Sequence, residues 1–288
     1  MSEAHEAPQH PTLPDGLSLG APFGIKLRLH WSFVLLGGWL MFSEYQRTGS
    51  FAVVAHIVVI ATVVFGSVAL HEYGHALTAR RYGIRTREIV LLPIGGIAQL
   101  ERSPADPRQE FWISLAGPAV NVVLAALAFG AATLFESGRD PLDQGLGGSL
   151  LGVAVNVNLF MGIFNLIPAM PMDGGRVLRA LLSLRMPALR ATRIATTVAQ
   201  LLAGGMMAYG VVGGRLMLAV IGGFVWIAAR AELRRAEFEA ALLERARRMA
   251  GRPFDAAGGW LGADALPEDP TDPGSGIRIV GSGSTRRR

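Results

Sequence analysis

Two histidines and a glutamate lie within five residues of one another, in the run His71-Glu72-Tyr73-Gly74-His75. In a helix, a spacing of four residues puts both imidazoles on one face, where they can bind a single zinc ion. Glu72 can then reach a water on that metal, remove its proton and later deliver the proton to a leaving amine. The pattern predicts zinc-dependent hydrolysis, although three fixed positions in five residues also recur by chance.

A catalytic zinc ion usually has three protein ligands and one open position, so the two histidines need a third partner. The sequence holds no cysteine, which leaves histidine, aspartate or glutamate. Asp173 is the one carboxylate in or bordering the apolar segment 145–172. Pro168 and Pro171 break the helix before it, and the two glycines after it let the backbone turn, so the carboxylate can point inward as a ligand. An ordinary loop carboxylate is the alternative.

The composition around these residues is that of a membrane protein. Charged residues make up 17% of the chain and hydrophobic residues 51%, whereas soluble globular domains carry about 25% charged residues. The 36 glycines suit close approach of transmembrane helices, and the same composition excludes a disordered or fibrous chain. Two histidines and a glutamate are costly at the end of a membrane span unless they are paired or bind a metal, which favours the zinc interpretation over a chance match.

Six apolar segments are candidate membrane spans, and the arginines between them predict the topology. Six arginines lie between the second and third segments and five follow the fourth, while each other connection holds one. Because cytoplasmic loops are enriched in Lys and Arg, both termini and the two arginine-rich loops should face the cytoplasm. The three candidate ligands then lie near the cytoplasmic ends of their spans, at one depth. The segments are 25–42, 51–70, 111–135, 145–172, 194–212 and 216–229.

Between the second and third segments, residues 88–101 read EIVLLPIGGIAQLE, which is apolar but too short to span a membrane. Pro93 and the two glycines that follow break helical periodicity, and β-branched residues on either side favour a β-hairpin. Such backbone is tolerated at membrane depth only where protein or water satisfies it, so it should lie beside the helix core or a wet cavity. The predicted fold is an all-α polytopic membrane protein with about six transmembrane helices and a short membrane-associated β-hairpin between helices two and three.

The run HEYGH at the end of one apolar segment, followed about a hundred residues later by NLIPAMPMDGGR, resembles the site-2 protease family of zinc intramembrane metalloproteases, peptidase family M50. The resemblance covers about residues 25–230. It implies one zinc ion per chain, bound by His71, His75 and Asp173, with Glu72 as general base and acid. Family members often carry a PDZ domain or CBS modules, and the short loops and tail here predict a compact form without them.

The resemblance also implies groups that contact the substrate. Asn165 corresponds to a polar group near the scissile peptide, and the run 115–121 resembles a Gly-Pro-containing core helix of the family that ends here in Asn121. Asn165 is the predicted catalytic amide, because it lies one to two helical turns before the loop that carries Asp173, where it can orient the substrate or stabilise the oxyanion. Asn121 is the second candidate for that role, and hydrogen bonding between helices is the alternative role of both. The segment 93–96 resembles the strand and loop that family members place beside the active site. The predicted substrate-binding residues are Gly95, Gly96, Ile97 and Asn121.

Four parts are expected along the chain. Charged residues with an apolar stripe predict an amphipathic helix at the cytoplasmic surface, and the Pro, Gly, Asp and Ser content of the last residues leaves too little apolar surface to fold alone. The parts are a disordered cytoplasmic N-terminal tail (1–22), a transmembrane metalloprotease domain (23–230), a cytoplasmic amphipathic helix (231–250) and a disordered C-terminal tail (251–288).

The predicted function is hydrolysis of a peptide bond in or near a transmembrane segment of a membrane protein substrate. The protein should be multi-pass in a bacterial or archaeal cell membrane, with the lipid bilayer and a membrane protein substrate as partners and no nucleic acid. A catalytically silent membrane scaffold and a metal-binding transporter are the alternatives. Glu72 argues against a transporter, which has no need of a non-ligand acid between two metal ligands.

Overall fold

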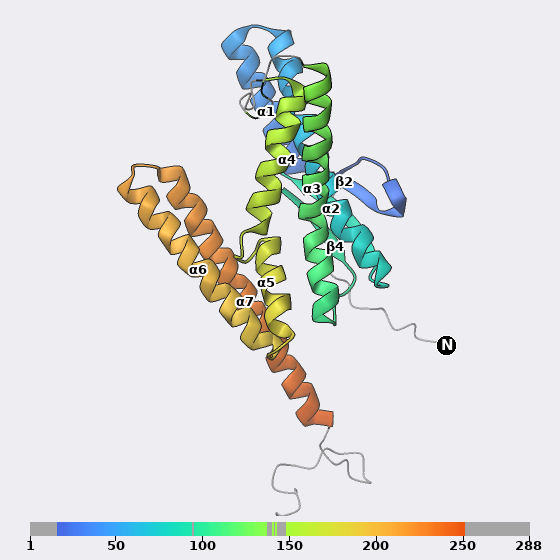
Figure 1. Cartoon of the computed structure of the whole chain (residues 1–288), viewed down its shortest axis with the longest axis vertical. Coiled ribbons are helices and arrows are strands. Elements are labelled where there is room, and N and C mark those ends of the chain that lie inside the picture. The colour runs from blue at the N-terminus through green and yellow to red at the C-terminus, as the bar shows by residue number, and fades with distance from the viewer. Residues whose placement is uncertain (1–15, 94, 137–139, 141, 143–147, 251–288) are drawn as a thin grey trace, which may run out of the picture. The chain divides into compact units, whose positions relative to one another are not determined.

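A computed structural model describes residues 16–93, 95–136, 140, 142 and 148–250 (Figure 1). The chain divides into two units, Met1–Ala236 and Glu237–Arg288, and the sheet and the site described below belong to the first. The predicted C-terminal tail lies outside the described residues, as does most of the predicted N-terminal tail. The end of that predicted tail differs from expectation, because Gly16–Ser18 forms a strand.

Helices make up most of the described chain. Four of them, α2, α3, α6 and α7, are long and apolar enough to cross a membrane, and α4 is a shorter apolar helix. The helices are α1 Trp31–Thr48, α2 Phe51–Arg81, α3 Pro107–Phe135, α4 Leu150–Leu166, α5 Asp173–Ser183, α6 Ala188–Val212 and α7 Leu216–Ala250.

Local signals explain where the central helices begin and end. The Asp106 side chain accepts a hydrogen bond from the Arg108 amide and caps α3, whose first residue is Pro107. Helix α2 ends with two arginines, which favour the negative end of the helix dipole, and Gly83 follows it in the left-handed region (φ 70°). Helix α3 packs against both α2 and α4, and α2 also contacts α4, so these three helices form one packed group within the first unit.

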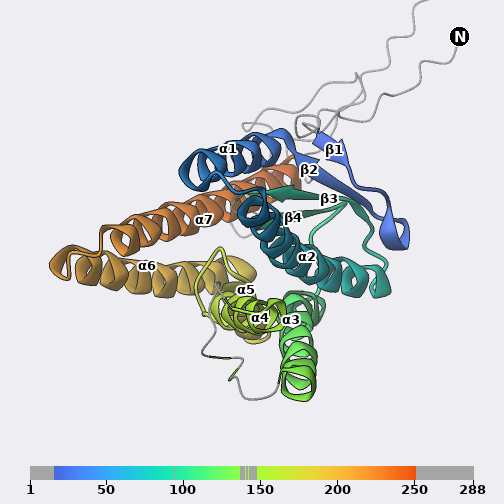
Figure 2. The same ribbon diagram turned by 90° about the horizontal axis from the view of Figure 1, so that it is seen from above.

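The predicted hairpin region is part of a larger sheet of four strands in the order β1-β2-β3-β4. Strand β2 runs parallel to β3, and the other two pairs are antiparallel, with Leu91 of β3 opposite Gly96 of β4. Figure 2 shows the strands side by side, with α2 along the sheet. The strands are β1 Gly16–Ser18, β2 Lys26–His30, β3 Thr86–Leu92 and β4 Gly95–Leu100.

Strand β2 corrects one prediction. The stretch 25–30 was expected to begin the first transmembrane helix, 25–42, and that expectation is wrong. Lys26, Arg28 and His30 alternate with leucines, and this period of two is the signature of a strand. Helix α1 starts only after His30, whose Nδ1 accepts a hydrogen bond from the Ser32 amide (3.1 Å).

The sheet is attached to α2 at the level of the HEYGH run. Ile89 and Leu91 of β3 pack with Val68, Tyr73 and Ala76 of α2 in one buried cluster. This packing fixes the sheet beside the turn of α2 that carries the histidines, so the next strand, β4, lies close to the candidate site.

The last two helices differ from expectation at one boundary. A span ending at 229 and a separate amphipathic helix from 231 were predicted, but α7 is continuous from Leu216 to Ala250. The stretch that joins them consists of Ala, Arg, Glu and Leu, which are strong helix formers, and it contains no glycine or proline to end the helix. Gly214, in the left-handed region at φ 65°, forms the tight connection between α6 and α7.

Candidate metal centre

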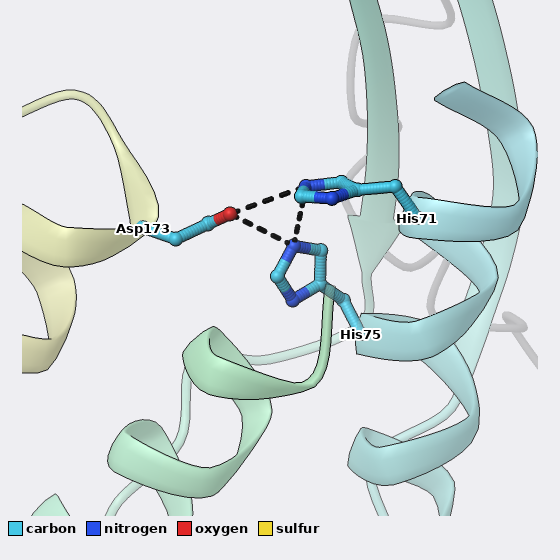
Figure 3. A group of neighbouring side chains, drawn as sticks. All are labelled: His71, His75 and Asp173. Carbon is cyan, nitrogen blue, oxygen red and sulfur yellow. Dashed lines mark hydrogen bonds and ion pairs between the residues drawn. The ribbon is translucent and has the colours of Figure 1, made fainter. Parts of the chain in front are cut away.

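Three side chains from two helices meet in the interior of the first unit (Figure 3). His71 and His75 come from consecutive turns of α2, and Asp173 is the first residue of α5. The Nε2 atoms of the two imidazoles are 3.1 Å apart, and each lies 3.2 Å from Oδ2 of Asp173. All three residues belong to one group that can hold a metal ion.

The dimensions of this triangle fit zinc. Bonds of 2.0–2.1 Å to imidazole nitrogen and carboxylate oxygen place tetrahedral ligand atoms about 3.3–3.4 Å apart, close to the observed 3.1–3.2 Å. Oδ2 of Asp173 is buried and has no hydrogen-bond partner within the described part of the chain. A buried carboxylate oxygen facing two imidazole nitrogens is the arrangement that a cation stabilises.

Both imidazoles present the correct nitrogen to the centre. The Nδ1 of His75 lies 2.6 Å from the main-chain oxygen of Ile113, and the Nδ1 of His71 lies 2.5 Å from Oδ1 of Asn121. Because a carbonyl oxygen only accepts, each Nδ1 carries the proton and donates it. Each Nε2 therefore turns an unprotonated lone pair toward Asp173, as a zinc ligand must.

Helix α3 reaches the imidazoles because Gly117 has no side chain. A Cβ at this position would lie 2.3 Å from Nε2 of His75 and 2.8 Å from Cε1 of His71. Gly74 of α2 allows the same close approach from the other side, since a Cβ there would lie 2.8 Å from the main-chain oxygen of Ala116. The backbones of α2 and α3 thus pack directly on each other at the site.

The loop between α4 and α5 delivers Asp173. Helix α4 ends at Leu166, two residues before Pro168, so the predicted segment 145–172 is helical in its described part only from Leu150 to Leu166. A Cβ on Gly174 would lie 2.3 Å from the main-chain oxygen of Leu166, which shows how closely the first turn of α5 folds back on α4. Further along α5, Arg179 donates a hydrogen bond to Glu110 of α3 (2.8 Å) and anchors the helix that carries the ligand.

Glu72 lies next to His71 on α2 and is covered by strand β4. A Cβ on Gly96 would lie 2.5 Å from Cγ of Glu72, so only glycine lets the strand pass this close. Within the described residues, Glu72 has no hydrogen bond or ion pair with another side chain, and it lines the cavity beside the three candidate ligands. Its carboxylate is thus free to exchange a proton with a water in that cavity.

The cavity has a volume of about 980 Å³. The candidate ligands and Glu72 lie on α2 and α5, β4 contributes Gly95, Gly96 and Ile97, and α4 contributes Asn165. Ile221, Phe224 and Val225 of α7 add an apolar wall. The space is therefore apolar over much of its lining and polar where the candidate ligands meet.

Comparison with known proteins identifies the family. The sequence model of peptidase family M50 matches residues 59–145 and 137–207, which together cover just over half of the chain. The chain belongs to peptidase family M50. The prediction from the two sequence motifs is thereby confirmed.

Three relatives illustrate how far the similarity extends. The zinc metalloprotease MJ0392 of Methanocaldococcus jannaschii is 35% identical over 216 residues, which is 75% of this chain and 60% of that protein. The putative zinc metalloprotease Rip3 of Mycobacterium tuberculosis is 34% identical over 240 residues, covering 76% of this chain and 58% of that one. The solved site-2 protease from Methanocaldococcus jannaschii shares 33% identity with a TM-score of 0.55, covering 76% of this chain and 95% of that chain.

This M50 chain therefore spans about 60% of the length of the curated relatives it matches. Its long apolar helices and its family identify it as an integral membrane protein. The ligand set of two histidines and one aspartate is one that zinc takes in proteins, in agreement with the names of the relatives.

In this M50 chain, the two asparagines predicted to contact the substrate lie in different surroundings. Asn165 lines the cavity, and its side chain makes no hydrogen bond within the described residues. Asn121 is fully buried (0% exposed) and lies behind His71, outside the cavity lining, although the sequence placed it among the substrate-binding residues.

Several residues that shape the site were not anticipated from the sequence. Gly117 stood in the Gly-Pro run, but nothing in that run indicated that its missing side chain makes room for two imidazoles. Ser67 is a buried polar residue in an apolar helix, which is a signal that could have found it.

Proposed function

We propose that this protein is an intramembrane zinc metalloprotease that hydrolyses a peptide bond in or near a transmembrane segment of a membrane protein. The observation that carries the proposal is the triangle of His71, His75 and Asp173 atoms with Glu72 beside it. The two histidines and Glu72 lie on α2, a helix apolar enough to cross a bilayer. The names of the relatives, zinc metalloprotease and site-2 protease, support the same reaction class.

The chemistry divides among a few residues. His71, His75 and Asp173 would hold zinc, which when bound polarises a carbonyl and lowers the pKa of a coordinated water toward ~7. Glu72 accepts the proton of the attacking water and returns it to the leaving amine. The Asn165 amide faces the same cavity and donates a hydrogen bond to the oxygen of the scissile carbonyl as negative charge develops there.

A transmembrane helix cannot be cleaved in its folded form, because its amides are bonded internally. Strand β4 is an edge of the sheet, and its residues Gly95, Gly96 and Ile97 line the cavity beside Glu72. An unwound stretch of substrate can add to this edge as a further strand, so that main-chain hydrogen bonds hold it next to the site. The proposed substrate-binding surface is thus β4, together with Asn165.

The proposal includes a topology with six membrane spans. The four long apolar helices account for four spans, and α1 with 18 residues and α4 with 17 residues account for the other two. The arginine-rich connections favour a cytoplasmic location for both termini, in a bacterial or archaeal cell membrane. Water then reaches the site from the cytoplasmic face.

A cleavage assay on a single-span test substrate in detergent or vesicles tests the proposal. The parent protein should cleave the substrate, and Glu72→Gln should keep its zinc while losing about 10²–10⁴-fold in rate, the range typical of general acid–base catalysis. Near-normal cleavage by Glu72→Gln would exclude this mechanism. Zinc binding by the parent without any cleavage would instead favour a silent scaffold.

A further inference from the structure

A chain of buried polar side chains runs from His71 through two neighbouring helices and back to α2. Oδ1 of Asn121 accepts from His71, Nδ2 of Asn121 lies 2.8 Å from Oδ1 of Asn158, and Nδ2 of Asn158 lies 3.0 Å from Oγ of Ser67. Asn121, Asn158 and Ser67 are 0%, 2% and 6% exposed. We call these three residues the amide relay.

Two main-chain oxygens fix the direction of every hydrogen bond in the amide relay. The Ser67 hydroxyl donates to the carbonyl of Val63 (2.9 Å), so its oxygen must accept from Asn158. The other N–H of Asn158 donates to the carbonyl of Ala154 (2.8 Å), so both of its donors are used and its Oδ1 must accept from Asn121.

The direction of the relay determines the proton position on His71. Because the amide nitrogen of Asn121 donates to Asn158, its oxygen faces His71 and can only accept. The proton of the neutral imidazole therefore lies on Nδ1, and the lone pair of Nε2 points at Asp173. Turning either amide over would place a donor against a donor, or an acceptor against an acceptor, in the low-dielectric interior.

We propose that Asn121, Asn158 and Ser67 are positioning residues that hold the tautomer and ring orientation of His71 required for zinc binding. Asn121 is absent from the cavity lining and fully buried, so it acts through His71 and not on the substrate. This inference rests on the zinc centre of the proposed function, but it does not depend on proteolysis.

Replacing Asn121 with leucine keeps the volume of the side chain and removes the acceptor for His71. The imidazole proton can then move to Nε2, where it competes with the metal for the lone pair. Loss of an outer-shell partner of a metal ligand typically weakens metal binding about 10–100-fold, and this is the expected change in the zinc dissociation constant for Asn121→Leu. Asn158→Leu should act in the same direction but less, because Asn121 keeps its contact with His71.

The experiment measures zinc affinity by chelator competition on the purified full chain, together with the visible absorption spectrum of the Co²⁺-substituted protein. The spectrum depends on ligand geometry, which a general loss of stability does not alter. The relay variants are Asn121→Leu, Asn158→Leu, their double mutant and Ser67→Ala. Thr62→Ala is the matched control for Ser67→Ala, because the Thr62 hydroxyl also donates to a carbonyl of α2 (Val58, 2.8 Å) but lies outside the relay.

If the relay acts through Asn121, the double mutant binds zinc no more weakly than Asn121→Leu alone, and the Co²⁺ spectrum changes in all relay variants but not in Thr62→Ala. Parent-like affinity and spectrum in Asn121→Leu would overturn the inference. Additive losses in the double mutant would also overturn it. If Asn121→Leu fails to fold, Ser67→Ala decides, since equal zinc affinity in Ser67→Ala and Thr62→Ala would exclude the relay.

A failure of the proposed function gives a different result. If the parent binds no zinc, or His75→Ala binds zinc as tightly as the parent, the metal centre itself is wrong. If the parent binds one zinc ion and cleaves substrate while the relay variants bind like the parent, only the relay is wrong. In zinc-free protein labelled with ¹⁵N in histidine, the ring resonances of His71 should show a proton on Nδ1 in the parent and a mixture of tautomers in Asn121→Leu.

Discussion

His75 and His71 lie one turn apart on α2, yet the surrounding structure holds their rings in different ways. The Nδ1 of His75 donates to a main-chain oxygen of α3, at Ile113, whereas the Nδ1 of His71 donates to a side chain whose orientation depends on two further side chains. No single substitution can remove a main-chain carbonyl. The orientation of His75 is therefore held by the main chain, whereas the orientation of His71 depends on the side chains of Asn121, Asn158 and Ser67.

The backbone support of His75 has its own requirement. In a helix, a side chain covers the turn that precedes it, so a side chain at position 117 would lie over the carbonyl of Ile113. Gly117 leaves this carbonyl open to His75. The main-chain support thus depends on a missing side chain, and the side-chain support depends on three that are present.

Gly117→Ala should have the largest effect, because it breaks both supports at once. The added Cβ would lie 2.3 Å from His75 and 2.8 Å from His71, so both rings must move. We expect loss of stoichiometric zinc and, with it, of detectable cleavage, measured by metal analysis and the substrate assay. Gly130→Ala on the same helix is the control, since a Cβ there meets nothing within 4 Å. Full zinc content in Gly117→Ala would show that the close approach of α3 is not required.

Gly96→Ala should slow turnover while leaving intact the hydrogen bonds that hold His71 and His75. Its Cβ would lie 2.5 Å from Cγ of Glu72, which must shift, while no atom of His71 or His75 is among its nearest contacts. A displacement of this size can cost about 10²-fold in rate, with zinc content unchanged. Adding Gly96→Ala to Glu72→Gln should change the rate little further. An additive loss in that double mutant would show that the strand acts other than through Glu72.

The glycines and the relay also show which parts of the site could be predicted from sequence. The grouping of His71, His75 and Asp173 could be expected, because a spacing of four residues defines one helix face and a single carboxylate borders the fourth apolar segment. The roles of Gly117 and Ser67 could not, because they arise from the approach of one helix to another, which spacing along one segment does not encode.

The same distinction holds for the fold. The long helices could be predicted because apolar length is a local property of the sequence. Strand β2 was missed because its alternation extends over only five residues and is continuous with the apolar residues of α1. Its pairing with β3 joins segments about sixty residues apart, a contact that no local pattern reveals.

Ile97→Pro should have a smaller effect than either glycine substitution, and it should leave both histidine supports intact. Proline removes one main-chain donor from the edge strand that we propose binds substrate. One hydrogen bond contributes about 0.5–1.5 kcal/mol, so cleavage should slow up to about tenfold with zinc content unchanged. Ile97→Val keeps the amide and serves as the control. Full activity of Ile97→Pro would argue against strand addition.

Ile113→Val should have the smallest effect and sharpens the comparison between the two histidines. It trims the side chain beside His75 but keeps the carbonyl that His75 needs. We expect a zinc dissociation constant close to that of the parent, against the 10–100-fold change predicted for Asn121→Leu. If Ile113→Val and Asn121→Leu weakened zinc binding equally, the main-chain hydrogen bond to His75 would be no less sensitive to substitution than the side-chain hydrogen bond to His71.

The location of the ligands on two separate helices has a consequence for biosynthesis. Both histidines leave the ribosome with α2, about a hundred residues before Asp173. Until α5 docks on α3 through Arg179 and Glu110, the nascent chain holds only a two-ligand half-site. Full zinc affinity, which arises only when both helices are in place, therefore reports that α5 has docked, and a chain interrupted before α5 cannot form the three-ligand centre.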